Sequence, residues 1–214
     1  MKFLIVDDHP MTAEGYKNAI SNSYNAGTFT VAENCKKAYF EILKTKGGNH
    51  FDIALIDKGL PEYPEEKMFS GVDVAHLLRT INPECKIVMI TAHTEYLVIY
   101  DIYKKIKPEG MISKGELTPQ NLVTLVEEVM SEENYLSPFV KECIKEIWKK
   151  DLMVDDFNRQ ILFYMSKGYK LKELEDVIFL ATSTIQRRVV NMKKAFDVSD
   201  DSSLIKTAIQ QGFM

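Results

Sequence analysis

The chain has no apolar run that approaches the roughly 20 residues needed to cross a bilayer. Its N-terminus meets an acidic pair too early to form the apolar core of a signal peptide. Cysteine is scarce, and the three residues are far apart, with no C-x-x-C pair or Cys/His cluster to indicate zinc. These absences predict a cytoplasmic protein with reduced thiols and no membrane segment.

What the first 131 residues do contain is an alternation of two patterns. Short apolar runs are expected to form strands at 3–6, 28–32, 52–57, 86–91 and 110–113. Helical periodicity lies between and after them, at 12–22, 35–45, 72–81, 94–105 and 118–131. Strands that alternate with helices indicate βαβ units, so we predict a doubly wound α/β domain with a five-stranded parallel sheet.

Polar residues stand where the predicted strands end. They are the pair Asp7 and Asp8 after the first strand, Asp57 on the third, Thr91 on the fourth and Lys114 after the fifth. In a doubly wound sheet these ends share one edge, so the side chains should converge. A single such aspartate could simply cap a helix, as Asp8 could do for the helix near Thr12. The whole set favours a functional site.

Clustered carboxylates repel each other and cost desolvation energy unless a cation lies among them. Magnesium prefers oxygen ligands, so we expect Mg²⁺ at this site. It would keep Asp57 ionised and able to attack phosphorus, giving an aspartyl-phosphate. Lys114 and Thr91 would then bind the phosphoryl oxygens.

The segments "VDDHP", "LIDKGLP", "ITAH" and "GMISK" together resemble the receiver domain of two-component response regulators, a flavodoxin-like fold. The resemblance covers 1–131. It implies that Asp57 is the phospho-acceptor and that Asp8 and Asp57 bind Mg²⁺ with the backbone carbonyl of Gly59, while Asp7 acts through water. Receivers commonly carry Tyr or Phe three residues before the lysine. Met111 stands there, so the usual aromatic switch is absent or altered.

The loop "PEYPEEKMFSG" at 61–71 is longer than the corresponding receiver loop. Its proline and glutamate content predicts a protruding acidic loop. Two interpretations stay open, a tolerated insertion and an element for partner recognition or site access.

Beyond residue 131 the strand pattern ends. Residues 132–150 are expected to be a partly helical linker, and 151–214 a small all-α domain with helices at 155–166, 171–179, 183–196 and 202–211. The second and third of these helices have helix-turn-helix spacing. Residues 167–196 carry seven basic residues against three acidic ones, which favours a polyanionic partner.

In the helix at 183–196, the spacing of Ile185, Val189, Met192 and Phe196 predicts the buried face. The surrounding sequence resembles the DNA-binding domain of the LuxR/NarL type, although the usual "LT-x-R-E" opening is replaced by "VDDFNRQIL". The resemblance implies base contacts from Gln186, Arg187 and Val190. It implies phosphate contacts from Lys172, Thr184, Lys193 and Lys194, and a dimerisation helix at 202–211.

The combined hypothesis is a response regulator of the NarL/LuxR type. A histidine kinase would phosphorylate Asp57, and this would control homodimerisation and binding to double-stranded DNA. We expect a transcription factor and no metabolic enzyme. Three alternatives stay open: a helical tail that binds a protein, a regulator that works without phosphorylation, and an aspartyl-phosphate hydrolase. Gly59 argues against the hydrolase, because a general acid would be useful at that position.

Overall fold

A computed structural model describes residues 1–22, 27–210 and 213. It divides into two compact units, Met1–Glu142 and Cys143–Met214, and each has its own hydrophobic core. The division falls inside 132–150, the segment expected to be the linker. No helix in the described part of the chain is both long and apolar enough to span a membrane.

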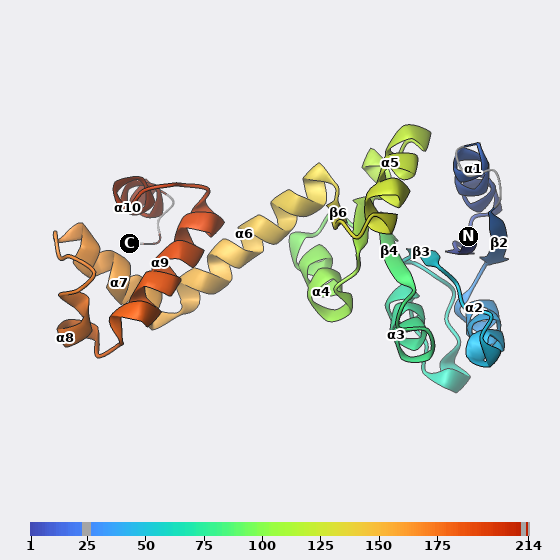
Figure 1. The fold of residues 1–214 in the computed structure, drawn as a ribbon, viewed down its shortest axis with the longest axis horizontal. Coiled ribbons are helices and arrows are strands. Elements are labelled where there is room, and N and C mark those ends of the chain that lie inside the picture. The colour runs from blue at the N-terminus through green and yellow to red at the C-terminus, as the bar shows by residue number, and fades with distance from the viewer. Residues whose placement is uncertain (23–26, 211–212, 214) are drawn as a thin grey trace. The chain divides into compact units, whose positions relative to one another are not determined.

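The first unit is built on a parallel sheet with the strand order β2-β1-β3-β4-β5-β6 (Figure 1). The strands are β1 (Lys2–Val6), β2 (Thr28–Ala32), β3 (Ile53–Asp57), β4 (Lys86–Thr91), β5 (Gly110–Ser113) and β6 (Tyr135–Leu136). The five predicted strands are confirmed, but the sheet has a sixth. β6 lies in the predicted linker and pairs with β5 through Gly110 and Met111. A strand of two residues is too short to show an apolar run or an alternation in the sequence.

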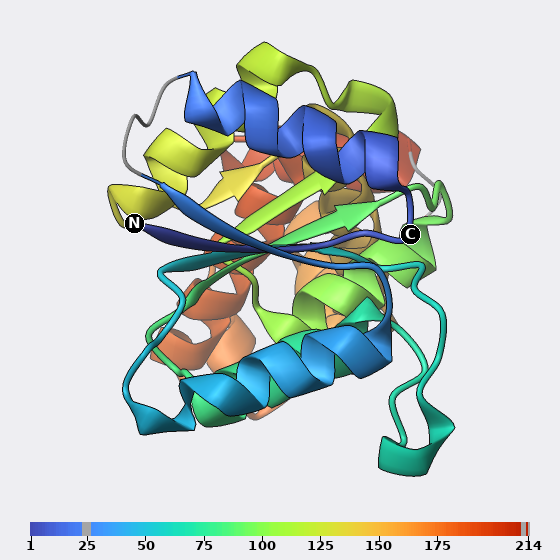
Figure 2. The same ribbon diagram turned by 90° about the vertical axis from the view of Figure 1, so that its right-hand side faces the viewer.

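Helices cover both faces of this sheet (Figure 2). They are α1 (Pro10–Ser21), α2 (Cys35–Leu43), α3 (Gly71–Ile81), α4 (Tyr96–Ile106) and α5 (Pro119–Met130). α1 packs with α5, while α3 packs with both α2 and α4. Because water reaches neither face, the central strands are almost entirely apolar and buried, which is why they appear in the sequence as continuous runs.

The long loop before α3 folds back toward α2. It contains a short 3₁₀ helix (Pro64–Glu66), and Tyr63 and Met68 on either side of it form an antiparallel bridge. The centroid of the Tyr63 ring lies 5.7 Å from that of Tyr39 and 6.3 Å from that of Phe40, and both of these residues are on α2. These contacts give the loop a defined position, and its role in recognition stays a prediction.

The second unit is all-helical. Its helices are α7 (Asp156–Ser166), α8 (Leu174–Ile178), α9 (Thr182–Phe196) and α10 (Asp201–Gln210), and α6 (Pro138–Val154) crosses the division between the units. The buried face predicted for α9 is confirmed. The predicted helix at 171–179 begins late, because Glu173 accepts a hydrogen bond from the Lys170 N–H and closes a turn there. The predicted end of the last helix, at 211, lies outside the described residues.

Candidate functional site

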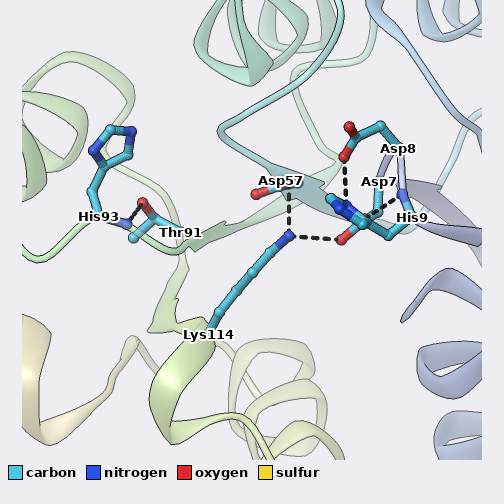
Figure 3. A network of polar contacts seen from close by, with 7 residues as sticks. All are labelled: Asp7, Asp8, His9, Asp57, Thr91, His93 and Lys114. Carbon is cyan, nitrogen blue, oxygen red and sulfur yellow. Dashed lines mark hydrogen bonds and ion pairs between the residues drawn. The ribbon is translucent and has the colours of Figure 1, made fainter. Parts of the chain in front are cut away.

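The side chains predicted to converge do lie at one edge of the sheet (Figure 3). Asp7 follows β1, Asp57 ends β3, Thr91 ends β4, and Lys114 follows β5. The ammonium group of Lys114 joins two of them: its Nζ lies 2.8 Å from Asp57 Oδ2 and 3.2 Å from Asp7 Oδ2. The strand order places β1 and β3 side by side where the chain switches direction across the sheet, the usual position of a ligand site in this architecture.

The acidic pair and the residue after it form the rest of the cluster. The His9 backbone N–H donates to Asp7 Oδ1 at 2.9 Å, and His9 Nδ1 lies 2.8 Å from Asp8 Oδ1. One ligand atom from each of Asp7, Asp8, His9 and Asp57 lies within 4.8 Å of the others. The three carboxylates fit an oxygen-preferring divalent cation, whereas the imidazole does not. Sequence reasoning assigned no role to His9, although its place next to the acidic pair was the available signal.

Charge in this site is only partly balanced. Asp7 is 1% exposed and Asp57 is 4% exposed, so water solvates neither carboxylate well. Burial raises the pKa of Asp57, although hydrogen bonding to Lys114 and the Lys114 charge oppose the shift. Burial alone would lower the pKa of Lys114, but the bonds and charges of Asp57 and Asp7 raise it above its ordinary value. One ammonium group serves two buried carboxylates, and an added cation would relieve the excess negative charge.

Two glycines shape the backbone around Asp57. A Cβ at Gly59 would lie 3.9 Å from Asp57 Oδ2, and the Gly59 backbone acts to lower the pKa of Asp57, against the effect of burial. Gly71 begins α3 so close to β3 that a Cβ there would lie only 1.9 Å from the Asp57 carbonyl oxygen. The Gly71 N–H also donates to the Lys58 carbonyl at 3.0 Å. Gly71 therefore fixes how the end of β3 meets α3, a requirement that sequence reasoning did not state.

Gly71→Ala is expected to destabilise the first unit by about 1 to 3 kcal/mol, because the new methyl group would have to push the Asp57 backbone aside. Urea unfolding followed by circular dichroism measures this change. Gly15→Ala is the matched control, because a Cβ at this exposed helical glycine meets nothing within 4 Å. If both variants unfolded at the same urea concentration, the close approach of Gly71 to Asp57 would be contradicted.

Thr91 and Met111, the other two predicted receiver positions, lie outside the acidic cluster. Thr91 is fully buried, and its Oγ1 accepts a hydrogen bond from the His93 N–H at 3.1 Å. In Figure 3 the Thr91 hydroxyl faces His93 and stands apart from Lys114. Met111 is fully buried in β5, in register with Met89 of β4. Its position in the sheet core is suited to packing, and its role in switching is a prediction.

The predicted DNA-contacting residues divide by exposure. Gln186, Arg187, Val190 and Lys194 are exposed on α9, and Lys172 is exposed in the turn before α8. Thr184 and Lys193 are only partly exposed, and Lys193 Nζ lies 2.9 Å from Asp201 Oδ1. This ion pair competes with the phosphate contact expected of Lys193. The remaining set still presents a mixed polar and basic face.

Comparison with known proteins places the first unit in a family. Residues 3–127 match the response regulator receiver domain, so the chain belongs to the response regulator receiver family. Response regulator UvrY of Escherichia coli strain K12 is 23% identical over 98% of this chain and 94% of its own length. The probable transcriptional regulatory protein NarL of Mycobacterium tuberculosis strain H37Rv is 23% identical over 99% of this chain and 94% of its own.

Solved structures agree with both parts of the fold. The RcsB response regulator of Salmonella typhimurium has a TM-score of 0.57 at 15% sequence identity and covers 98% of each chain. An RcsB–DNA complex gives the same TM-score, 0.57, at 14% identity. At these identities the similarity establishes the fold: a parallel receiver sheet flanked by helices, followed by a helical domain.

Proposed function

We propose that the protein is a phosphorylation-controlled transcription factor. A histidine kinase would supply a phosphoryl group to Asp57, and the second unit would bind double-stranded DNA. The observation that carries the proposal is the contact of Lys114 with both Asp57 and Asp7 at the sheet edge. It supports a site that holds a divalent cation and a phosphoryl group together.

The chemistry follows from the positions of the side chains. Asp8, Asp57 and the Gly59 carbonyl would hold Mg²⁺, with Asp7 acting through water, and the bound ion would offset charge on the phosphoryl oxygens. The donor would be a phosphorylated histidine of the kinase. An Asp57 carboxylate oxygen would attack its phosphorus, the P–N bond would break, and the electron pair of that bond would leave with the histidine imidazole. Lys114 then pairs with a phosphoryl oxygen, and the Thr91 hydroxyl donates to another.

The added charge would bias the receiver between two states and promote homodimerisation. The relatives are named as regulators, and solved structures include two RcsB dimers bound to two parallel DNAs, at a TM-score of 0.58. We assign 1–131 to the receiver, 132–150 to the linker and 151–214 to the DNA-binding domain. Because its partners would be a kinase and DNA, the protein would act in the cytoplasm, in signalling and not in metabolic catalysis.

The test is the oligomeric state and DNA affinity of the whole chain with and without Mg²⁺ and beryllium fluoride, a phosphoryl mimic. We expect a shift from monomer to dimer in light scattering. We also expect DNA binding to tighten by about 5- to 150-fold, the usual size of coupling between two sites. The affinity should fall steeply as salt rises, because phosphate contacts release counterions.

Other outcomes point to the alternatives. DNA binding that ignores the mimic would indicate a regulator that works without phosphorylation. No DNA binding even at low salt would indicate a tail that binds a protein. Steady release of phosphate from small phosphoesters would revive the hydrolase.

A further inference from the structure

The first residue of α9 is bonded to a carboxylate from the helix before it. Ala181 stands at the N-cap position of α9, and its methyl side chain cannot accept a hydrogen bond. Glu175 of α8 supplies the acceptor instead, because its Oε2 accepts the Thr182 N–H at 3.3 Å and also the Thr182 hydroxyl. The chain reverses between the two helices at Phe179, whose φ is 58°. A negative charge is therefore held at the N-terminus of α9.

No lysine or arginine in the described part of the second unit balances this charge. Glu175 is exposed, and it takes part in none of the ion pairs among the described residues of that unit. For the helix itself the charge is favourable, because the N-terminus of a helix carries a partial positive charge. For a second anion that approaches the same end, it is unfavourable.

DNA is such an anion, and it would approach this end of α9. In a helix-turn-helix pair the N-terminal residues of the second helix contact base edges in the major groove, which phosphates line on both sides. α9 is the second helix of the pair that α8 begins, and Gln186 and Arg187 are exposed in its N-terminal half. The N–H groups at a helix N-terminus are suited to bind a phosphate. Here the Glu175 carboxylate already occupies the Thr182 N–H.

We infer that Glu175 limits the affinity of the second unit for DNA, because its carboxylate repels the DNA backbone while it caps α9. The inference rests on the proposed function, since it concerns the same DNA-binding face. One side chain then has two effects of opposite sign: it stabilises the fold and weakens binding. A single copy of the chain would bind DNA weakly, and two linked copies on one duplex would regain affinity through their effective concentration. This combination suits control by dimerisation.

The experiment compares the whole chain with its Glu175→Gln variant, which keeps the acceptor oxygen and removes the charge. Fluorescence anisotropy measures binding to a labelled mixed-sequence DNA duplex at low salt, with Mg²⁺ and beryllium fluoride present. We expect the dissociation constant of the variant to fall by about fivefold, the effect of one unit charge at contact distance in water. The difference should shrink as salt rises, because salt screens exposed charges. The urea midpoint of the second unit, followed by tryptophan fluorescence, should nevertheless fall, because the helix loses a favourable charge.

Asp176→Asn is the matched control, because it removes one negative charge from the next position of α8. Asp176 is exposed and, unlike Glu175, it forms no hydrogen bond with Thr182 in the described structure. Its variant should change the DNA affinity less than Glu175→Gln does and should leave the urea midpoint where it is.

Three results would overturn the inference. Unchanged or weaker DNA binding by Glu175→Gln would show that the carboxylate serves only the fold of α9. Equal tightening in Glu175→Gln and Asp176→Asn would show that total charge matters and the position at α9 does not. A tightening that stayed constant as salt rose would exclude electrostatic repulsion as the cause. Failure of the proposed function would look different, because neither the wild type nor any variant would then bind the duplex at low salt, and the inference would fall with it.

Discussion

Asp57→Asn is expected to abolish labelling by radioactive acetyl phosphate, while the wild-type chain is labelled as long as Mg²⁺ is present. The amide of asparagine keeps the shape of the side chain but is not a nucleophile toward phosphorus. Asp57 ends β3 with its carboxylate 2.8 Å from Lys114 Nζ, so the phosphoryl oxygens would form next to an ammonium group. Autoradiography after gel electrophoresis measures the result, and chelation of Mg²⁺ with EDTA should abolish labelling in the same way.

Misfolding is a poor explanation for that loss, because the substitution removes a buried charge. Burial raises the pKa of Asp57, which means that its ionised form is disfavoured in the folded protein. In the variant Lys114 still pairs with Asp7, now in a balanced pair. The metal-free midpoint of urea unfolding should therefore stay level or rise.

Asp101→Asn is the control for this experiment, because Asp101 is exposed on α4 and pairs only with Lys105 among the ion pairs of the described residues. It should be labelled as the wild type is. Labelling that survived Asp57→Asn would show that another carboxylate accepts the phosphoryl group, and Asp7 and Asp8 would be the nearest candidates.

How far the sequence predicts this fold depends on the length of each signal. The five longer strands show as apolar runs because both faces of the sheet are buried. β6 has two residues, and its pairing with Met111 arises only because the chain passes β5 on its way to α6. The late start of α8 likewise depends on a side-chain bond from Glu173, which outweighs the local periodicity.

The site was predictable in its members and less so in its contacts. Strand ends in a parallel sheet share an edge, so Asp7, Asp57 and Lys114 had to come together. Nothing in the order of residues says that Lys114 bridges the two carboxylates, or that Thr91 bonds to His93.

The roles of two neighbouring arginines on α9 also could not be predicted from the order of residues. Arg187 is exposed and makes no ion pair with any described residue. Arg188 Nη1 donates to Asp155 Oδ2 at 2.8 Å and to Asn158 Oδ1 at 2.9 Å, and its guanidinium lies 5.5 Å from the Phe157 ring. The two side chains have the same chemistry, so only the packing of α9 against α7 assigns one to solvent and the other to the fold.

Arg187→Ala is therefore expected to weaken DNA binding by roughly 1 to 3 kcal/mol and to relax sequence preference, as loss of a base contact does. Its unfolding should not change. Arg188→Ala should destabilise the second unit by about 1 to 2 kcal/mol, because it removes charge-assisted bonds to a partly exposed carboxylate. Fluorescence of Trp148, the single tryptophan, reports this unfolding, since its ring packs on the core of that unit.

The pH dependence separates the two variants further. Burial opposes ionisation of Asp155, but the hydrogen bond and charge of Arg188 lower its pKa below the ordinary value. A carboxyl group with a depressed folded pKa stabilises the protein above its unfolded pKa of about 3.9, and this contribution is lost as pH falls through the folded pKa. Arg188→Ala should lose that part of the acid sensitivity, whereas Arg187→Ala should keep it. If Arg187→Ala destabilised the unit and left DNA affinity intact, α9 would present a different face to DNA than its exposed residues indicate.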